Sequence, residues 1–263
     1  MTADAQSLAA APVPGDLAAR AALPPWVGVL AMPVFLTAVC VWLYLYVSRQ
    51  ELDTIETRLL EGQYVRERLV EHITLASVAT VLMIAIAVPL GILLTRPLLR
   101  RLTPLFIGLA NIGQAIPAIG LVILFPVVWS QIGFRPMLYA LIIHSALQVL
   151  RNTMVGLDQV DRALIQAGRG MGMSKLRVLM RIELPLAVPV ILAGVRTALV
   201  LNVGVATLGT FINAGTLGDV IDNGVGLNRE PVIITGAVLT AVLALTTDWV
   251  ASIAERVLRP KGL

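Results

Sequence analysis

Residues 73–94 read ITLASVATVLMIAIAVPLGILL, and this run contains no charged side chain. A transmembrane helix needs about 20 consecutive apolar residues to cross the hydrocarbon core of a bilayer, so the run is long enough to span a membrane. Comparable apolar runs recur along the chain. We therefore predict an all-α membrane protein with about six transmembrane helices, at residues 26–47, 72–94, 104–129, 136–150, 186–211 and 232–257.

The composition agrees with this fold class. Apolar residues make up 57% of the 263 residues and charged residues only 14%, whereas soluble globular proteins average about 45–50% and about 25%. These values exclude a soluble enzyme and a disordered chain, and the single cysteine, Cys40, excludes a disulfide framework within the chain. We expect flexible cytoplasmic tails at 1–25 and 259–263, with a first transmembrane helix and an extracytoplasmic amphipathic helix at 26–69.

Basic residues are unevenly distributed among the connections between the predicted spans. If the N-terminus is cytoplasmic, the connections and tail on that side hold twelve lysines and arginines, and those on the other side hold six. Lysine and arginine accumulate on the cytoplasmic side of membrane proteins, so we expect both termini in the cytoplasm. The same placement explains the basic pI without a nucleic-acid partner.

Prolines and glycines interrupt several predicted spans, most clearly the third and the fifth. In lipid, backbone groups freed by a proline must be satisfied by neighbouring helices or by water in a cavity. Small residues also let helices approach closely. Two interpretations remain open, namely ordinary close packing of the bundle and kinked helices that line a passage.

The connection at 151–189 is the most informative part of the chain. It is too polar to enter the membrane, and its pattern predicts two short amphipathic helices joined by a turn. Carboxylates and hydroxyls can cap helix starts, glycine suits helix exits, and proline disfavours helix before it. Asp158 and Asp161 precede the first helix, Gly170 and Gly172 end it, Ser174 precedes the second helix, Leu176, Leu179 and Met180 form its apolar stripe, and Pro185 closes it.

Residues 166–185, QAGRGMGMSKLRVLMRIELP, resemble the cytoplasmic motif of type I, binding-protein-dependent ABC importer permeases. In that motif E-A-A-x-x-x-G is followed, after nine residues, by I-x-L-P. The nine-residue interval is preserved here, while glutamine replaces the acid and glycine replaces the second alanine. The resemblance implies that this connection couples to a separate ATPase, the alternative being a cap that packs on the bundle. The residues that would serve ATPase coupling are Gln166, Ala167, Gly168, Gly172, Ile182, Leu184 and Pro185.

Other stretches resemble one branch of this superfamily, the permeases for glycine betaine, choline and related osmoprotectants. The resemblance covers residues 70–258, the expected ABC importer transmembrane core. It implies a transport subunit of the bacterial inner membrane that works with ABC ATPase subunits, an extracytoplasmic substrate-binding protein and a second permease copy or homologue. Alternatives are the same machine for an amino acid, sulfonate or methionine, and a secondary carrier. The stretches are GQAIP at 113–117, GMGMS at 170–174, ELPLA at 183–187, ILAGVRT at 191–197 and GTLGD at 215–219.

We expect neither a nucleotide site nor catalytic, cofactor or metal-binding residues in this chain. After the run GRGMG at 168–172 the serine precedes the lysine, the reverse of the order in a phosphate-binding loop, and the context is helix–turn–helix, so ATP hydrolysis must be supplied by a partner. Aromatic faces usually hold quaternary ammonium ligands, and aromatic residues make up only 5% of the chain. High affinity for such a ligand is therefore expected in the extracytoplasmic binding protein.

Arg196 and Asp248 are charged residues within the fifth and sixth predicted spans. Both lie about ten residues from the cytoplasmic end, about 12–15 Å deep at 1.5 Å per residue. Opposite charges at the same depth of a membrane are expected to pair. We predict an intramembrane ion pair that ties the two helices together, with a substrate contact as the alternative.

His72 and His144 lie in the second and fourth predicted spans, where we expect each to serve helix packing rather than a metal or proton relay. Asp219, Asp222 and Glu230 precede the last span on the outer side. They could meet a substrate-delivering protein, but a solvated loop is the simpler interpretation.

Overall fold

The computed structural model describes residues 25–258, and every regular element within them is helical. The predicted tails at 1–25 and 259–263 lie outside the described residues, apart from Pro25. In chain order the elements are α1 (Pro25–Ser48), α2 (Thr54–Leu59), α3 (Gly62–Leu94), η2 (Arg100–Leu102), α4 (Thr103–Ala115), α5 (Ala118–Trp129), α6 (Phe134–Asp158), α7 (Arg162–Gly170), α8 (Lys175–Val178), η3 (Leu179–Glu183), α9 (Leu184–Ala206), η4 (Thr207–Ile212), α10 (Gly218–Gly226) and α11 (Glu230–Leu258).

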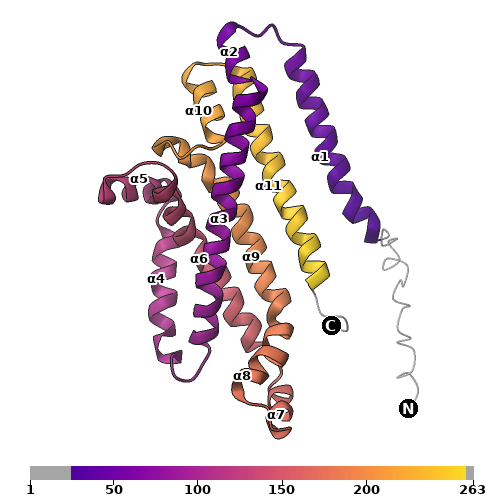
Figure 1. Cartoon of the computed structure of the whole chain (residues 1–263), viewed down its shortest axis with the longest axis vertical. Helices are drawn as coiled ribbons and strands as arrows, with labels where there is room; N and C mark the ends of the chain where they lie inside the picture. The colour runs from indigo at the N-terminus through magenta and orange to yellow at the C-terminus, as the bar shows by residue number, and fades with distance from the viewer. Residues whose placement is uncertain (1–24, 259–263) are drawn as a thin grey trace, which may run out of the picture.

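The long helices form one bundle in which α6 packs against both α3 and α9 (Figure 1). Met83 of α3, Val149 and Leu150 of α6 and Ala198 of α9 form a buried apolar cluster between these three helices. In lipid, which is as apolar as these side chains, close van der Waals packing of this kind holds the helices together. The three helices are therefore the rigid frame from which the shorter elements extend.

Close approach of α6 and α9 depends on a glycine. A Cβ atom placed on Gly194 of α9 would lie 2.5 Å from Asn152 Cβ of α6, which is closer than real carbon atoms approach. Small residues at such crossings let helix backbones pack tightly. At Gly194 the structure thus supports the packing interpretation.

Four helical runs of the described chain are both long and apolar enough to cross a membrane, and the bent pair α4–α5 brings the number to five. Helix α6 spans 25 residues but does not meet both criteria. It carries polar residues such as His144 and Asn152, and it packs against α3, α4, α5 and α9. A total of six spans therefore stays a prediction.

The predicted span at 104–129 is broken into two helices, α4 and α5. The chain bends by 99° between α4 and α5, and Ile116 at the bend has an extended ψ of 127°. The cause is Pro117, whose ring disfavours helical geometry for the residue before it. Figure 1 shows α5 projecting sideways from α4. The segment is therefore kinked at Pro117.

The outer amphipathic helix is shorter than its polar stretch. Asp53 forms a reciprocal capping box with Glu56 and starts α2, but α3 begins already at Gly62 and so extends ten residues before the predicted span. Helix α1 packs along α11, where the Trp249 indole Nε1 donates a 2.9 Å hydrogen bond to the Val29 carbonyl.

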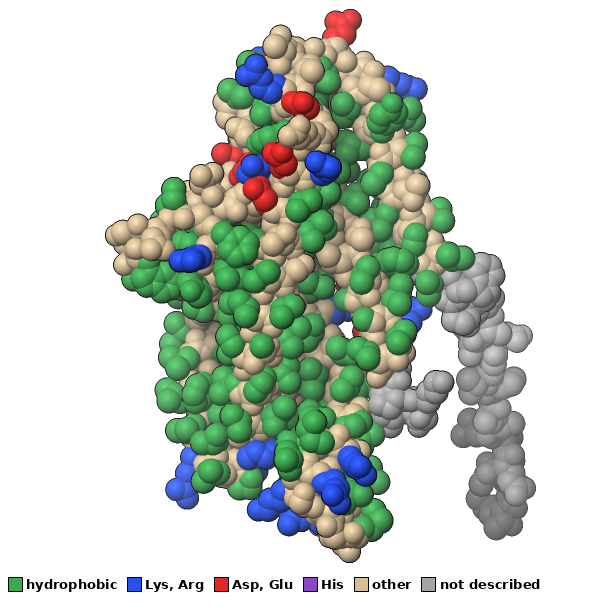
Figure 2. Space-filling model, viewed as in Figure 1, with side chains coloured by type: hydrophobic (Ala, Val, Ile, Leu, Met, Phe, Trp, Pro, Cys, Tyr) green, Lys and Arg blue, Asp and Glu red, His purple; other side chains and the backbone are tan. Residues whose placement is uncertain are grey.

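Charge is polarised along the bundle. Lysine and arginine side chains gather at the end formed by α7 and α8, whereas the acidic side chains visible in Figure 2 gather toward the opposite end. Helix α1 begins, and α11 ends, on the side of the molecule nearer to α7 and α8 (Figure 1). The two described chain ends thus point the same way.

Candidate functional site

The connection between α6 and α9 folds as a compact elbow, residues 162–185. The Asp161 carboxylate accepts a 2.8 Å hydrogen bond from the amide at position 163, and the Ser174 hydroxyl accepts one at 3.3 Å from the amide at position 177. The predicted caps at Asp161 and Ser174 are confirmed, whereas the cap at Asp158 is wrong, because Asp158 is the last residue of α6. Gly172 has a φ of +82°, in the left-handed region that suits a helix exit. The predicted helix–turn–helix is therefore present.

Gly168 brings the two arms of the elbow together. A Cβ atom at this position would lie 2.6 Å from Ile182 Cδ1 and 3.5 Å from Val178 Cγ2. The glycine that departs from the E-A-A pattern thus lies where α7 meets η3. Val178, which is 1% exposed, is the buried apolar residue of the second arm.

The predicted end of the second helix at Pro185 is wrong. Helix α8 passes into the π-helical turn η3, in which the Leu184 amide donates to the Leu179 carbonyl, and α9 starts at Leu184. Pro185 is the second residue of α9, and the chain before it stays helical through the π-turn η3. Because the helix is not interrupted, the elbow continues directly into α9.

The seven predicted coupling residues do not form one surface. Gln166 and Ala167 are exposed on α7, and Gly172 is exposed at the turn. The other four residues, Gly168, Ile182, Leu184 and Pro185, are buried or partly buried at the junction of the elbow with α9. The motif therefore has an outer part that a partner can reach and an inner part that shapes the elbow.

The tip of the elbow exposes large apolar side chains. Leu176 is 67% exposed and Met180 is 58% exposed, so the predicted apolar stripe of the second helix faces outward at these two positions. Leu164 and Met171, also in the elbow, are 48% and 71% exposed. Large exposed apolar patches mark interaction sites in many proteins. We call these four residues the apolar tip.

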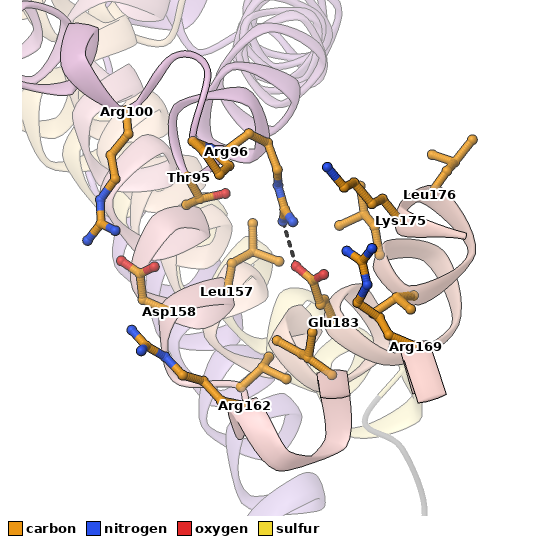
Figure 3. Close-up of a pocket in the computed structure, with 15 residues that line it drawn as sticks. Thr95, Arg96, Arg100, Leu157, Asp158, Arg162, Arg169, Lys175, Leu176 and Glu183 are labelled. Atoms are coloured by element: carbon orange, nitrogen blue, oxygen red, sulfur yellow. Dashed lines mark hydrogen bonds and ion pairs between the residues drawn. The ribbon is translucent and has the colours of Figure 1, made fainter. Parts of the chain in front are cut away.

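An ion pair ties the elbow to α3. Arg96 Nη2, just beyond the end of α3, lies 2.6 Å from Glu183 Oε2 (dashed line in Figure 3), and the Glu183 side chain is 8% exposed. The sequence analysis missed this pair, because Glu183 occupies the unspecified position of I-x-L-P and its partner is 87 residues away. The elbow is thus fixed to two long helices, α9 by continuity and α3 by charge.

Arg196 and Asp248 meet between α9 and α11. Arg196 Nε lies 2.5 Å from Asp248 Oδ1, and Nη2 lies 2.6 Å from Oδ2, so the contact is bidentate. Arg196 Nη1 also lies 3.8 Å from Glu255 Oε2. The three charged residues line an open cavity of about 530 Å³ together with Thr197 and Leu201. One arginine therefore lies between two carboxylates of α11.

His72 is fully buried, and both its ring nitrogens have partners. Nε2 lies 2.9 Å from the Val203 carbonyl, and Nδ1 accepts a hydrogen bond of 3.2 Å from the Leu217 amide. This arrangement selects the neutral ring with its proton on Nε2, and it confirms the packing interpretation for His72. His144 is partly buried, and its Nδ1 has no hydrogen-bond partner among residues 25–258.

The interpretation of Asp219 as part of a solvated loop is wrong. Asp219 lies in α10, with a side chain that is 15% exposed, and its Oδ2 accepts a 2.9 Å hydrogen bond from Arg68 Nη1. Arg68 also pairs with Glu71. The carboxylate therefore attaches α10 to the start of α3.

Residues 87–260 match the family described as the binding-protein-dependent transport system inner membrane component. The chain belongs to this family. It is accordingly a membrane subunit of a transport system and not itself an enzyme. The matched region contains the elbow and both residues of the Arg196–Asp248 contact, whereas α1, α2 and most of α3 precede it.

Curated relatives are similar over most of their length. A choline transport system permease protein of Bacillus subtilis is 40% identical over 73% of this chain and 88% of its own length. A carnitine transport permease protein of Listeria monocytogenes is 38% identical, with coverage of 81% and 93%. An osmoprotectant import permease protein of Salmonella typhimurium is 37% identical, with coverage of 81% and 100%.

Solved structures show the same fold. An inward-facing MetNI methionine ABC transporter has a chain that superposes with a TM-score of 0.67 at 23% identity, covering 80% of this chain and 100% of its own. A chain of an amino acid ABC transporter superposes with a TM-score of 0.65 at 17% identity, covering 79% and 99%. At these identities the likeness concerns the fold alone.

Proposed function

We propose that this chain is the permease subunit of an ATP-driven importer for a compatible solute, glycine betaine, choline or a related osmoprotectant, in the bacterial cytoplasmic membrane. The three relatives above, named for choline, carnitine and osmoprotectant transport, support the solute class. The observation that carries the transport mechanism is the elbow. It presents an apolar tip to solvent on a short structure that runs without a break into α9.

In this proposal the apolar tip and the exposed residues Gln166 and Ala167 seat in a groove of an ABC ATPase subunit. The uncharged Gln166 makes hydrogen bonds but no ion pair there, so apolar contact supplies most of the affinity. Closure of the ATPase dimer moves the elbow. Since the elbow continues into α9 and is tied to α3 through Arg96 and Glu183, the motion reorients both helices as a rigid-body transition.

The orientation that fits this coupling places both termini in the cytoplasm. The basic side chains at the elbow end and the acidic side chains at the opposite end support it (Figure 2), because cytoplasmic connections are rich in arginine and lysine. The extracytoplasmic end, with α2 and α10, would then receive the substrate-binding protein. A second permease copy or homologue would complete the passage.

Solute recognition is assigned to the binding protein. In the described chain, Phe125, Trp129 and Tyr139 form an aromatic cluster with ring centroids 4.8 Å and 5.0 Å apart. Phe125 stacks on Trp129, Tyr139 meets Trp129 edge-on, and Trp129 and Tyr139 share a cavity with Arg135. The positive charge of Arg135 beside the rings repels a cationic ligand. The permease therefore offers a transient path for a quaternary ammonium solute.

The coupling proposal is tested by co-purification from native membranes, followed by identification of the ATPase and binding protein that accompany the chain. Leu176→Asp puts a charge on the apolar tip and should abolish recovery of the ATPase. Leu98→Asp is the matched control, because Leu98 is 88% exposed outside the elbow. Equal recovery with Leu176→Asp and wild type would overturn the docking assignment.

The transport proposal is tested by uptake of radiolabelled choline and glycine betaine in cells with and without the gene. Uptake should stop on ATP depletion and should resist unlabelled methionine. Uptake that survives ATP depletion and collapses with the ion gradient would indicate a secondary carrier. Competition by methionine or another amino acid would reassign the solute.

A further inference from the structure

Two adjoining cavities lie at the cytoplasmic end of the bundle, between the elbow and the ends of α3, α4 and α6. The larger, about 540 Å³, is bordered by the elbow and by the connection after α3 (Figure 3). The smaller, about 360 Å³, lies between α3, α4 and α6. Thr95, Arg100 and Asp158 line both. The two cavities therefore form one continuous depression.

The larger cavity carries excess positive charge. Glu183 is neutralised by Arg96 at 2.6 Å, which leaves one other acid, Asp158, facing four basic residues. Within the described residues 25–258, Asp158 forms no ion pair with any of these four basic residues. Figure 3 shows Arg100, Asp158 and Arg162 on one side of the cavity and Arg169 and Lys175 on the other. The four basic residues are Arg100, Arg162, Arg169 and Lys175.

The smaller cavity is mostly apolar, with a wall formed by Leu94, Pro104, Ile107 and Met154. It opens where α3 ends and α4 begins, which is the level at which the apolar spans give way to the arginine-rich connection. A soluble anion has no hydrocarbon part that could contact such an apolar wall. A molecule with a charged head and a hydrocarbon chain fits both cavities at once.

We propose that this depression binds an anionic phospholipid, with its phosphate held by Arg100 and Arg162 and the first part of an acyl chain in the apolar cavity. Arginine suits phosphate because its planar guanidinium donates two parallel hydrogen bonds. Basic pockets between helices on the cytoplasmic side are recurrent headgroup sites in membrane proteins. The site lies against the Arg96–Glu183 contact, so an occupied site braces the elbow. The proposal stands independently of the solute.

The test uses the full-length chain in a nonionic detergent, titrated with short-chain phosphatidylglycerol below its micelle concentration. The readout is the shift of the thermal unfolding midpoint. Phosphatidylglycerol should raise the midpoint, and the phosphatidylcholine of equal chain length should not. Glycerol phosphate, which has the headgroup charge without acyl chains, should bind far more weakly. Equal effects of the two lipids, or of glycerol phosphate and phosphatidylglycerol, would overturn the proposal without any mutant.

Variants locate the site. Arg100→Gln and Arg162→Gln should each weaken phosphatidylglycerol binding about tenfold, the loss expected when one charge-assisted contact is removed. Arg101→Gln is the matched control, since Arg101 is the next residue in the chain, is exposed and does not line either cavity. Loss of binding in Arg101→Gln as large as in Arg100→Gln would show general charge attraction and would overturn the site.

Discussion

Arg96 and Glu183, 87 positions apart in the chain, face each other at 2.6 Å and join the end of α3 to the elbow. The glutamate side chain is almost fully buried, while the arginine remains one-third exposed. A buried carboxylate is stable only when it is paired and hydrogen-bonded. The contact thus holds the elbow in register with α3, in addition to its direct continuity with α9.

Arg96→Ala should destabilise the protein by about 1–3 kcal/mol, because it leaves the buried Glu183 carboxylate without its partner. Glu183→Gln should have a smaller effect, since the amide keeps an oxygen acceptor for Arg96. Thermal unfolding in detergent measures both. Arg101→Ala removes the same charge from an exposed site nearby, and an equal effect there would show that the ion pair contributes nothing specific.

Two glycine-to-alanine changes should alter the free energy of unfolding by different amounts. At Gly194 the new Cβ would meet Asn152 Cβ at 2.5 Å, close to the α6 backbone, so α6 and α9 must separate at a penalty of about 1–3 kcal/mol. At Gly168 the only clash is with the mobile end of Ile182, since Val178 Cγ2 lies at an ordinary contact distance of 3.5 Å, and alanine favours helix by about 1 kcal/mol. Unfolding midpoints should therefore fall for Gly194→Ala and stay nearly unchanged for Gly168→Ala. Equal losses would contradict this account.

Arg196→Ala and Asp248→Ala should be non-additive. Arg196→Ala leaves the Asp248 carboxylate without its partner, and Asp248→Ala leaves Arg196 with Glu255 alone. The double change removes the pair, so a coupling energy of about 0.5–3 kcal/mol is expected from the cycle. Glu255 lies 3.8 Å from Arg196 and can compensate in part for Asp248→Ala. Arg196→Ala should accordingly be the more harmful of the two. Additive effects on unfolding would contradict the coupling.

His72→Leu should be strongly destabilising, because it keeps side-chain volume but leaves the Leu217 amide and the Val203 carbonyl unpaired in a buried position. Each buried group left without a hydrogen-bond partner lowers the stability by about 1–3 kcal/mol. His144→Leu is the control, since the structure gives its Nδ1 no partner to lose among residues 25–258. Thermal unfolding of the two variants, side by side, tests the assignment. Similar midpoints would count against it.

Local patterns predicted the helical elements and the elbow caps well. Apolar runs such as 73–94 identify a span because the bilayer requires length and apolarity from the segment alone. Asp161 and Ser174 act on amides two and three residues away, so their roles are visible in sequence. The helix exit at Gly172 is local in the same sense.

Two differences between the sequence analysis and the structure concern the effect of a proline on a helix. Pro117 broke a span and Pro185 did not, although both are prolines in apolar surroundings. The difference lies in the hydrogen bonds before each proline. Before Pro185 the π-turn η3 bonds the Leu184 amide to the Leu179 carbonyl and keeps Leu184 helical, whereas before Pro117 Ile116 becomes extended.

From its residues alone, this chain is committed to a helical membrane fold and to a capped helix–turn–helix at 162–185, because spanning length and capping act between near neighbours. Contacts between distant positions required the folded bundle: Arg96 with Glu183, Asp219 with Arg68, and the two cavities that share Arg100. Charge and size alone leave many possible partners for each of these residues. The packing of α3, α6 and α9 selects one of them by bringing two specific backbone segments together.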